Sequence, residues 1–373
     1  MSRSNFFILH FRPIENYPPV QNLIYVLNHS KLIELSVFCL STTGKLPKIS
    51  DKGLKIFRFG KLSSNKIILW LTYLAYNSFA IYMLVKYRPM QVMYFESLSA
   101  LPAYLYINII NPRAKLFIHY HEYTSLEEYR VASLVERILH RLEKRLYKKS
   151  NWISHTNEVR LNKFLKDENL DFNQDRDHHV PNFPLKSWAI QNEKWDGKET
   201  LKFVYVGYTL TEEGSYLQEL IDYLNHQSEK IVLSIYCLHL NEFVMQKEVT
   251  KGNLKIRVYK GLAYKQLSSV LSKHHIGLVL YKAKTPNYIY NAPNKLFEYL
   301  SCGLDVWYPQ EMQGIFEYDS NKTPMVKRLD FNNLSENKIN TIFSSSEKSK
   351  VSGSFNYCAE EVYLNLINKI LDK

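Results

Sequence analysis

The chain has 373 residues, of which 46% are hydrophobic and 23% are charged. This length exceeds one ordinary domain and is enough for two, and the apolar content excludes an intrinsically disordered chain. Cys39, Cys237, Cys302 and Cys358 form no Cys-x-x-Cys motif, which argues against a zinc knuckle or a disulfide framework and favours a reducing, cytoplasmic environment.

Positive charge is concentrated near the N-terminus. The chain carries a net charge of +12, and residues 1–120 contain 14 basic and 4 acidic residues, a surplus of ten. Such a patch attracts an anionic membrane, nucleic acid or a phosphorylated substrate. No nucleic-acid-binding motif accompanies it, so we expect no nucleic-acid partner. The densest part holds Lys45, Lys48, Lys52, Lys55, Arg58, Lys61 and Lys66.

The first half predicts strands at 6–11, 35–40, 55–59, 91–97, 115–121 and 152–156, with helices between most of them. This alternation is typical of a parallel sheet with helices on both faces, where ligands bind at the carboxyl ends of the strands.

Residues 67–85 form an uncharged stretch of 19 residues directly after the basic segment. Its length admits a membrane span, but polar residues dilute it, and spanning would separate neighbouring strands across a bilayer. Two interpretations stay open: a buried core helix, or a helix that lies partly in the membrane interface. Our hypothesis is that residues 45–88 dock on an anionic membrane, as a peripheral protein of its inner face.

Polar side chains follow three of these strands. Arg12 and Glu15 follow the first strand, and Glu96 lies at the end of another; we take these three as candidate acceptor-side residues. His121 ends the strand at 115–121 and shares a face with His119. The histidines are candidates for catalysis, although a pair of hydrogen-bonded structural histidines is about equally plausible from sequence.

The middle of the chain, residues 167–199, is polar and lacks periodicity, as expected of an interdomain linker. It contains "DRDHH" at 175–179, whose carboxylates and imidazoles resemble metal ligands. Because this stretch follows a helix and not a strand, a solvated charged loop is the better interpretation. We therefore assign no metal site.

The second half repeats the pattern, with strands predicted at 201–208, 230–238, 253–261, 276–282 and 304–308. The predicted fold class is α/β, with two tandem Rossmann-like, doubly wound domains facing across a cleft. The expected domains are an N-terminal Rossmann-like domain at 1–183 and a C-terminal Rossmann-like domain at 184–354. A C-terminal helix at 355–373 is expected to pack back toward the first domain.

The stretch "NAPNKLFEYLSCGLDVW" at 291–307 predicts a helix that starts near Pro293 and stops before Gly303. Lys295 lies in its first turn, where the helix dipole disfavours a cation, and Glu298 follows one turn later among apolar residues. A diphosphate at the helix N-terminus would make the lysine favourable, and a ribose diol could bind the carboxylate. The alternative is a surface salt bridge between the two side chains.

The stretches "PNKLFEYLSCGLDV" (293–306), "VYKGLAYKQLSSVLSKHHIGLVLYK" (258–282) and "HTNEVR…HHVPNFP" (155–184) resemble the GT-B-fold "glycosyl transferases group 1", which are glycosyltransferase family 4-like. The resemblance implies a metal-independent, hexosyltransferase-type enzyme that uses a UDP- or GDP-linked sugar as substrate and needs no cofactor. The acceptor would be a polyprenyl-diphosphate-linked or other glycan in surface polysaccharide biosynthesis.

Specific roles follow from the resemblance. It implies that 1–183 is the acceptor-side domain and that 184–354 is the nucleotide-sugar-binding domain. Glu298 would bind the ribose hydroxyls, and Gly261 would lie near the nucleobase. Asn294 and Lys295, just after Pro293, would lie near the diphosphate or sugar, and His121 would lie beside the donor sugar. We take His121 and Lys295 as the catalytic candidates.

The sequence also departs from the family pattern. Tyr290 stands where retaining members often have the first glutamate of Glu-x7-Glu. The usual Arg and Lys are absent from "VGYTLTEEGS", so Lys295, Lys260 or Lys282 would have to meet the diphosphate charge. Two alternatives therefore stay open: a nucleotide-sugar epimerase of the same fold, and a non-catalytic nucleotide-sugar-binding partner subunit.

Overall fold

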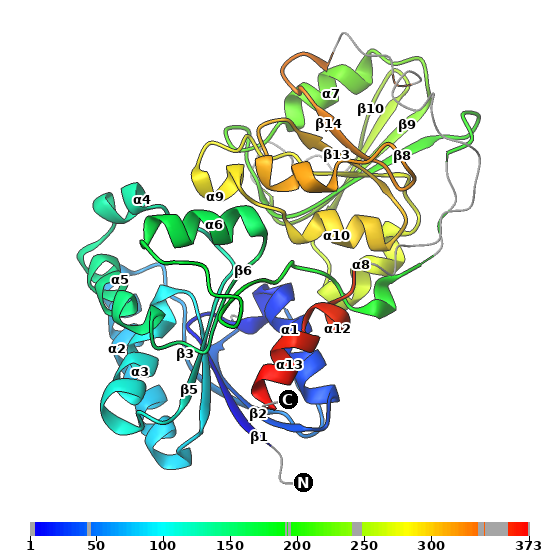
Figure 1. Ribbon diagram of the computed structural model, residues 1–373. Helices are drawn as coiled ribbons and strands as arrows, with labels where there is room; N and C mark the ends of the chain where they lie inside the picture. Colours follow the sequence, from blue (N-terminus) through cyan, green and yellow to red (C-terminus); the bar gives the residue numbers. More distant parts are fainter. Residues whose placement is uncertain are drawn as a thin grey trace. The chain divides into compact units, whose positions relative to one another are not determined.

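The computed structural model describes residues 4–42, 46–190, 192, 195–240, 248–334, 339 and 357–371. Lys45 of the basic segment lies outside the described residues. The chain divides into two compact units (Figure 1), which are described separately below. Unit 1 comprises Met1–Pro181 together with Ala359–Lys373, and unit 2 comprises Asn182–Cys358.

Unit 1 contains a parallel sheet of seven strands in the order β3-β2-β1-β4-β5-β6-β7. The order reverses between β1 and β4, so the carboxyl ends of these two strands form a topological switch point. The strands are β1 (Ser4–His10), β2 (Ile33–Ser41), β3 (Lys55–Lys61), β4 (Gln91–Phe95), β5 (Lys115–Tyr120), β6 (Trp152–His155) and β7 (Asp177–His179).

Helices cover both faces of this sheet (Figure 1). Helices α2, α3, α5 and α6 contribute to one apolar core, whereas α1 contacts the C-terminal helix α12. The helices are α1 (Pro18–His29), α2 (Lys66–Tyr87), α3 (Ala100–Leu105), α4 (Leu126–Val131), α5 (Leu134–Tyr147), α6 (Glu158–Asp167), α12 (Ala359–Val362) and α13 (Leu364–Ile370), with short helical turns at Ile14–Asn16, Ser97–Ser99 and Tyr106–Ile110.

Unit 2 contains a second seven-stranded sheet in the order β10-β11-β9-β8-β12-β13-β14, parallel except for β10. Its order reverses between β8 and β12, which makes a second switch point. The strands are β8 (Leu201–Leu210), β9 (Ile231–Leu240), β10 (Glu248–Lys251), β11 (Leu254–Lys260), β12 (Ile276–Leu278), β13 (Asp305–Pro309) and β14 (Val326–Leu329).

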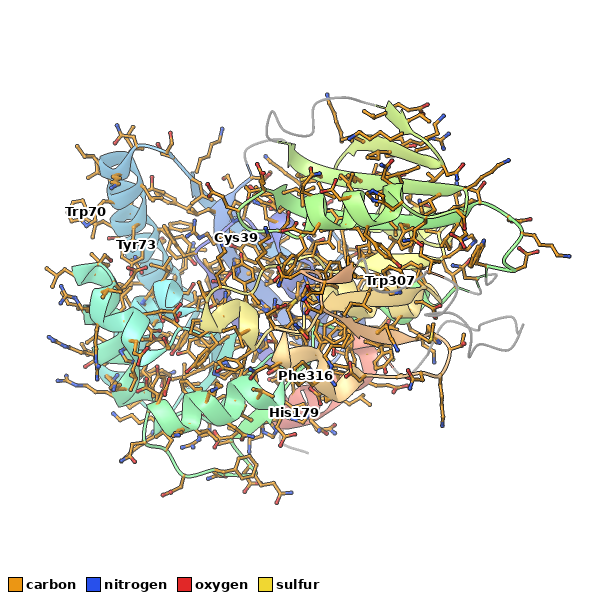
Figure 2. All side chains as sticks on the ribbon, turned by 90° about the horizontal axis from the view of Figure 1, so that it is seen from above. Cys39, Trp70, Tyr73, His179, Trp307 and Phe316 are labelled. Carbon is orange, nitrogen blue, oxygen red and sulfur yellow. The ribbon has the colours of Figure 1, made fainter. Side chains whose placement is uncertain are left out.

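Two apolar clusters cover the two faces of this sheet. One includes α7 and the largely buried Trp307, which lies inside the unit in Figure 2. The other includes α8 and α10. The helices are α7 (Leu217–Asn225), α8 (Tyr264–Leu271), α9 (Pro286–Ile289) and α10 (Asn294–Ser301), with short helical turns at Lys186–Trp188 and Gln313–Tyr318.

The prediction of two tandem domains with mostly parallel sheets is confirmed, and every predicted strand is present. The prediction that 175–179 is a loop is wrong, because Asp177–His179 forms the edge strand β7 beside β6. This strand is only three residues long and polar, so it lacks the apolar run that marks buried strands. The N-terminal segment of unit 1 ends at Pro181, which lies within the segment predicted to be a linker.

Helix α2 is long and apolar enough to cross a membrane by length and composition, but only 33% of its apolar window is buried. Asn65 caps it by accepting from the backbone N–H groups of Ile67 and Ile68. The strand before α2 and the strand after it, β3 and β4, belong to one sheet, which argues against spanning. Figure 2 shows Trp70 at the outer side of α2, and its side chain is half-exposed.

Candidate functional site

Helix α10 places Lys295 and Glu298 where the sequence predicted a helix. Pro293 is its N-cap residue, and Gly303 follows its end with φ +74°, a conformation that favours glycine. Tyr299 fixes the helix on the sheet: its hydroxyl accepts from Val206 N–H at 3.1 Å and donates to the carbonyl of Leu278 at 3.3 Å. Because Val206 lies in β8 and Leu278 ends β12, Tyr299 bridges the two strands at the switch point.

Lys295 is buried, with 7% of its surface exposed. Its Nζ lies 4.3 Å from the ring centre of Tyr205 and 4.6 Å from that of Tyr281. Burial opposes the charge, but interactions with Tyr205 and Tyr281, including those of their hydroxyl groups, outweigh it and raise the pKa of Lys295 above its ordinary value. The lysine is therefore held as a cation between two aromatic rings.

Glu298 lies one turn further along α10 and is 5% exposed. Burial raises the pKa of its carboxyl to about 7, although the positive charge of Lys295 acts in the opposite direction. Among the described residues, no side chain hydrogen-bonds to this carboxyl group. A buried acid without a protein partner, with its pKa close to neutrality, has the properties of a ligand-binding group.

A cavity of about 320 Å³ lies at the same switch point of unit 2. Its wall combines two lysines with several hydroxyl groups, which suits a phosphate-bearing ligand. The lining residues come from β8 and the loop after it, and from the segment after β12. They are Tyr205, Thr209, Thr211, Gly214, Ser215, Tyr281, Lys282, Ala283, Lys284, Thr285 and Tyr288.

The other candidates of unit 2 lie at nearby strand ends. Lys282 lines the cavity and pairs with Glu219, with 2.7 Å between Nζ and Oε1. Asn294 is the first residue of α10. Gly261 follows β11, and a side chain there would collide with Leu238 at the end of β9. Tyr290 ends α9, and its carbonyl packs so closely on Gly314 that a side chain at 314 would clash.

Sequence reasoning missed the aromatic partners of Lys295 and the hydroxyl groups of the cavity. Tyr205 and Tyr281 meet only because β8 and β12 are neighbours in the sheet, although they are far apart along the chain. The one feature of the sequence that could have indicated this role is the position of Tyr281 at the carboxyl end of the strand predicted at 276–282.

In unit 1, the structure brings Glu96 and His121 together at the ends of β4 and β5. Glu96 Oε1 accepts from the backbone N–H of His121 at 2.6 Å and from that of Glu122 at 3.3 Å. Burial and the neighbouring carboxylate of Glu122 raise the pKa of Glu96 to about 8. Glu96 also has φ +59° and ψ 156°, a strained conformation that is typical of functional positions.

His121 also contacts His119, as the sequence predicted for two residues on one face. His119 Nε2 lies 3.2 Å from His121 Nδ1, and His119 Nδ1 lies 2.7 Å from Ser154 Oγ. Burial lowers the pKa of His119 to about 3, so this ring is neutral. The buried, neutral His119 orients the His121 ring.

The remaining acceptor-side candidates have different surroundings. Glu15 is buried in an ion pair with Arg58, with 2.7 Å between Oε1 and Nη2, and it also accepts from Ile49 N–H. This contact joins two parts of unit 1, so Glu15 serves packing. Arg12 follows β1, and its carbonyl contacts His10 Nδ1 at 2.9 Å. In the described structure, neither the Arg12 nor the Glu15 side chain hydrogen-bonds to Glu96, so the three acceptor-side candidates do not form one cluster.

The "DRDHH" stretch is engaged in structural contacts. Arg176 makes an ion pair with Asp177, with 2.6 Å between Nε and Oδ1. His178 stacks on Trp152 at 3.6 Å between ring centres. Within the described part of the chain, no group of three or more His, Cys, Asp or Glu is arranged to hold a metal ion.

No protein-family model and none of the curated proteins matches this chain. Solved structures do. The lipopolysaccharide outer core galactosyltransferase WaaB in its apo form matches with a TM-score of 0.63 and 12% identity, over 99% of both chains. HepE from Anabaena in complex with UDP and glucose matches with a TM-score of 0.63 and 9% identity, over 99% of this chain and 98% of the other.

The chain has the GT-B fold. A third match with this fold is UDP-GlcNAc 2-epimerase from Neisseria meningitidis bound to UDP-GlcNAc, with a TM-score of 0.56 and 13% identity, over 99% of this chain and all of the other. Glycosyltransferases and an epimerase thus share this architecture, and the identities support the fold alone. The GT-B assignment agrees with the resemblance seen in the sequence.

Proposed function

We propose that the protein is a glycosyltransferase that moves a sugar from a UDP- or GDP-linked donor to a glycan acceptor. The observation that carries this proposal is the cavity at the β8/β12 switch point, two of whose lining rings, Tyr205 and Tyr281, contact the buried Lys295; buried Glu298 follows one turn later in α10. A nucleoside diphosphate needs positive charge and hydroxyl groups for its phosphates and a hydrogen-bond acceptor for its ribose. Similar structures bound to UDP with glucose, and to UDP-GlcNAc, agree with this ligand class.

The catalytic contribution is electrostatic. The positive charge of Lys295 stabilises the diphosphate as the sugar–phosphate bond breaks, and Lys282, which is paired with Glu219, contributes a hydrogen-bond donor at the cavity wall. Glu298 holds the ribose, and His121, supported by Glu96, contacts the transferred sugar or assists proton transfer. Because Lys295 meets the developing charge, we propose that the transfer needs no metal ion.

An assay with a panel of nucleotide sugars, with or without a polyprenyl-diphosphate acceptor, tests this function. We expect nucleotide release that depends on the acceptor, persists in EDTA and falls at least about 100-fold in Lys295→Met. An epimeric nucleotide sugar without release would instead support the epimerase alternative, which shares the fold of a similar structure. Binding without turnover would support the non-catalytic partner subunit.

We further propose that unit 1 docks on the cytoplasmic face of an anionic membrane, where a lipid-linked acceptor in polysaccharide biosynthesis would be found. One part of the surface of helix α2 packs into the core of unit 1, but many of its large apolar side chains are exposed to solvent. Exposed Lys61 and Lys66 lie at its N-terminal end, which suits an anionic surface. The exposed apolar side chains of α2 are Ile67, Ile68, Trp70, Leu71, Leu74, Tyr82, Val85 and Tyr87.

Sedimentation with vesicles tests this docking. Trp70→Glu with Leu74→Glu is expected to lower binding to phosphatidylglycerol vesicles at least about tenfold, because it places two charges in the interface. Phe172→Glu is the matched control, since Phe172 is 62% exposed and lies outside α2. Equal loss in both variants, or binding that is the same for neutral vesicles, would contradict the proposal. Self-association through α2 would appear as a dimer in solution without lipid.

A further inference from the structure

The surroundings of Lys295 are unusual for a buried lysine. A lysine with 7% exposure normally pairs with a carboxylate, because an unpaired buried charge is costly. Among the described residues, no carboxylate lies within 4.0 Å of its Nζ, and no hydrogen-bond acceptor satisfies it. Glu298, one turn away, is not within this distance. The contacts of the ammonium group are the rings of Tyr205 and Tyr281.

Aromatic rings and carboxylates stabilise a cation in different ways. A carboxylate neutralises the positive charge of the lysine that it pairs with, so that the pair exerts only a weak electrostatic attraction on a nearby anion. A ring face attracts the cation through its quadrupole and has no net charge, so the full positive charge of the lysine persists. Two rings can therefore keep Lys295 protonated without neutralising it.

The same two rings border the cavity. Tyr205 and Tyr281 both line it, and Lys295 contacts both rings without being a lining residue itself. An anion in the cavity would thus contact the same two side chains as an uncompensated positive charge. Electrostatic attraction acts strongly over such a short separation, because the protein interior has a low effective dielectric constant.

We propose that Tyr205 and Tyr281 form an aromatic cage that keeps Lys295 charged for the diphosphate of the donor. This inference rests on the proposed function for the identity of the anion. It assigns the two tyrosines as positioning residues, which act on the ligand through Lys295. The cage would supply the positive charge that the segment after β8 lacks, since "VGYTLTEEGS" contains no Arg or Lys.

The first test measures the charge of Lys295 in the full-length protein without ligand, by NMR titration of selectively labelled lysines. Lys295→Met identifies its signal. Tyr281→Phe keeps the ring and removes only the hydroxyl group, so it is expected to lower the pKa of Lys295 less than Tyr281→Leu, which is expected to lower it by about 1. An unchanged pKa in Tyr281→Leu, or an equal fall in Tyr281→Phe, would overturn the cage.

The second test measures affinity for UDP relative to uridine, and for GDP relative to guanosine, by calorimetry. The ratio isolates the contribution of the phosphates. We expect Tyr281→Leu to lower the ratio by about tenfold, Tyr281→Phe to change it less than about twofold, and Tyr281→Leu in a Lys295→Met background to have no further effect. Tyr208→Leu, which removes an exposed ring of β8 that is not among the residues lining the cavity, is the matched control and should leave the ratio unchanged.

The two tests separate this inference from the proposed function. A rise of the ratio in Tyr281→Leu would mean that the rings compete with the anion for the lysine, and it would overturn the proposal. A fall that persists without Lys295 would overturn it as well. If neither nucleotide binds, the proposed donor class fails, while the NMR titration still decides whether the cage holds the charge.

Discussion

Glu298 is expected to change its protonation state near neutral pH. Its carboxyl is buried and has a pKa of about 7, so it changes charge in the range where an ordinary glutamate is already ionised. Ribose hydroxyls donate to the ionised form more strongly than to the protonated form. Nucleoside binding is therefore expected to depend on pH through this one residue.

The corresponding measurement uses uridine and guanosine, because they carry no phosphate that titrates. With a pKa of about 7, roughly a tenth of Glu298 is ionised at pH 6 and roughly nine tenths at pH 8, so affinity should rise about ninefold. In Glu298→Gln the rise should vanish. In Lys295→Met the midpoint should move to higher pH, because Lys295 lowers the pKa of Glu298.

Two results would contradict this account of Glu298. Wild-type affinity that does not change between these pH values would exclude the carboxyl from ribose binding. A rise that survives in Glu298→Gln would assign the pH dependence to another group.

Sequence reasoning reached Lys295 and Glu298 because each conflicts with its local surroundings. A cation in the first turn opposes the helix dipole, and a carboxylate between apolar neighbours has to be buried. Tyr205 and Tyr281 show no such conflict, since tyrosine is common in strands and loops. Their role depends on which strands are neighbours, and strand order is not written in the local sequence.

At the scale of elements, α10 is held by one close contact with the sheet. Gly277 in β12 leaves room for the ring of Tyr299, and a side chain at 277 would collide with that ring. Tyr299 in turn satisfies Val206 N–H and the carbonyl of Leu278. The position of Lys295 and Glu298 relative to the cavity therefore depends on a glycine in the neighbouring strand.

Gly277→Ala and Tyr299→Phe test this coupling. Tyr299→Phe leaves a buried backbone N–H unpaired and should lower the free energy of unfolding by about 1–3 kcal/mol. Gly277→Ala should cost more, because the ring has to move and α10 with it. Urea denaturation measures both, and UDP calorimetry should show weaker binding in Gly277→Ala.

Gly252→Ala controls for the general effect of replacing a glycine, since nothing lies within 4 Å of a Cβ built there. Its positive φ of +55° adds only a local backbone cost. If Gly277→Ala binds UDP as tightly as wild type, α10 is not positioned by this contact.

The buried strands could be predicted from the sequence because of their apolar side chains, and the strands that lack such side chains were not predicted. A parallel strand covered on both faces reads as a continuous apolar run, as in Phe6–Leu9 and Val92–Phe95, all of which are buried. The edge strand β7 has no such run, because it consists of Asp177, His178 and His179, and Arg176 pairs with the buried Asp177. The antiparallel strand β10 is mostly exposed and was missed for the same reason.

At the scale of the whole molecule, the chain returns to unit 1 after completing unit 2. The C-terminal helices bury Tyr363, Leu366 and Ile370, and the carbonyl of Ile370 accepts from Gln91 Nε2 at 2.6 Å. Tyr363 donates to the carbonyl of Pro19 at 3.4 Å. Unit 1 is therefore built from both ends of the chain, whereas unit 2 is continuous.

This connectivity predicts that a chain ending at Cys358 is impaired in unit 1 alone. Losing three buried side chains should lower the stability of unit 1 by about 5 kcal/mol, at about 1.5–3 kcal/mol each. Unit 2 keeps all residues of the cavity, so its affinity for UDP should be retained. Calorimetric unfolding should show one transition at lower temperature and one unchanged, and UDP should raise only the second.

The matched control is Asn365→Ala, an exposed substitution on α13 that should leave both transitions in place. A single cooperative transition that shifts as a whole would mean that the two units do not unfold independently. Loss of UDP binding in the shortened chain would mean that unit 2 requires an intact unit 1, and the nucleotide site would then have to be assigned to more than unit 2.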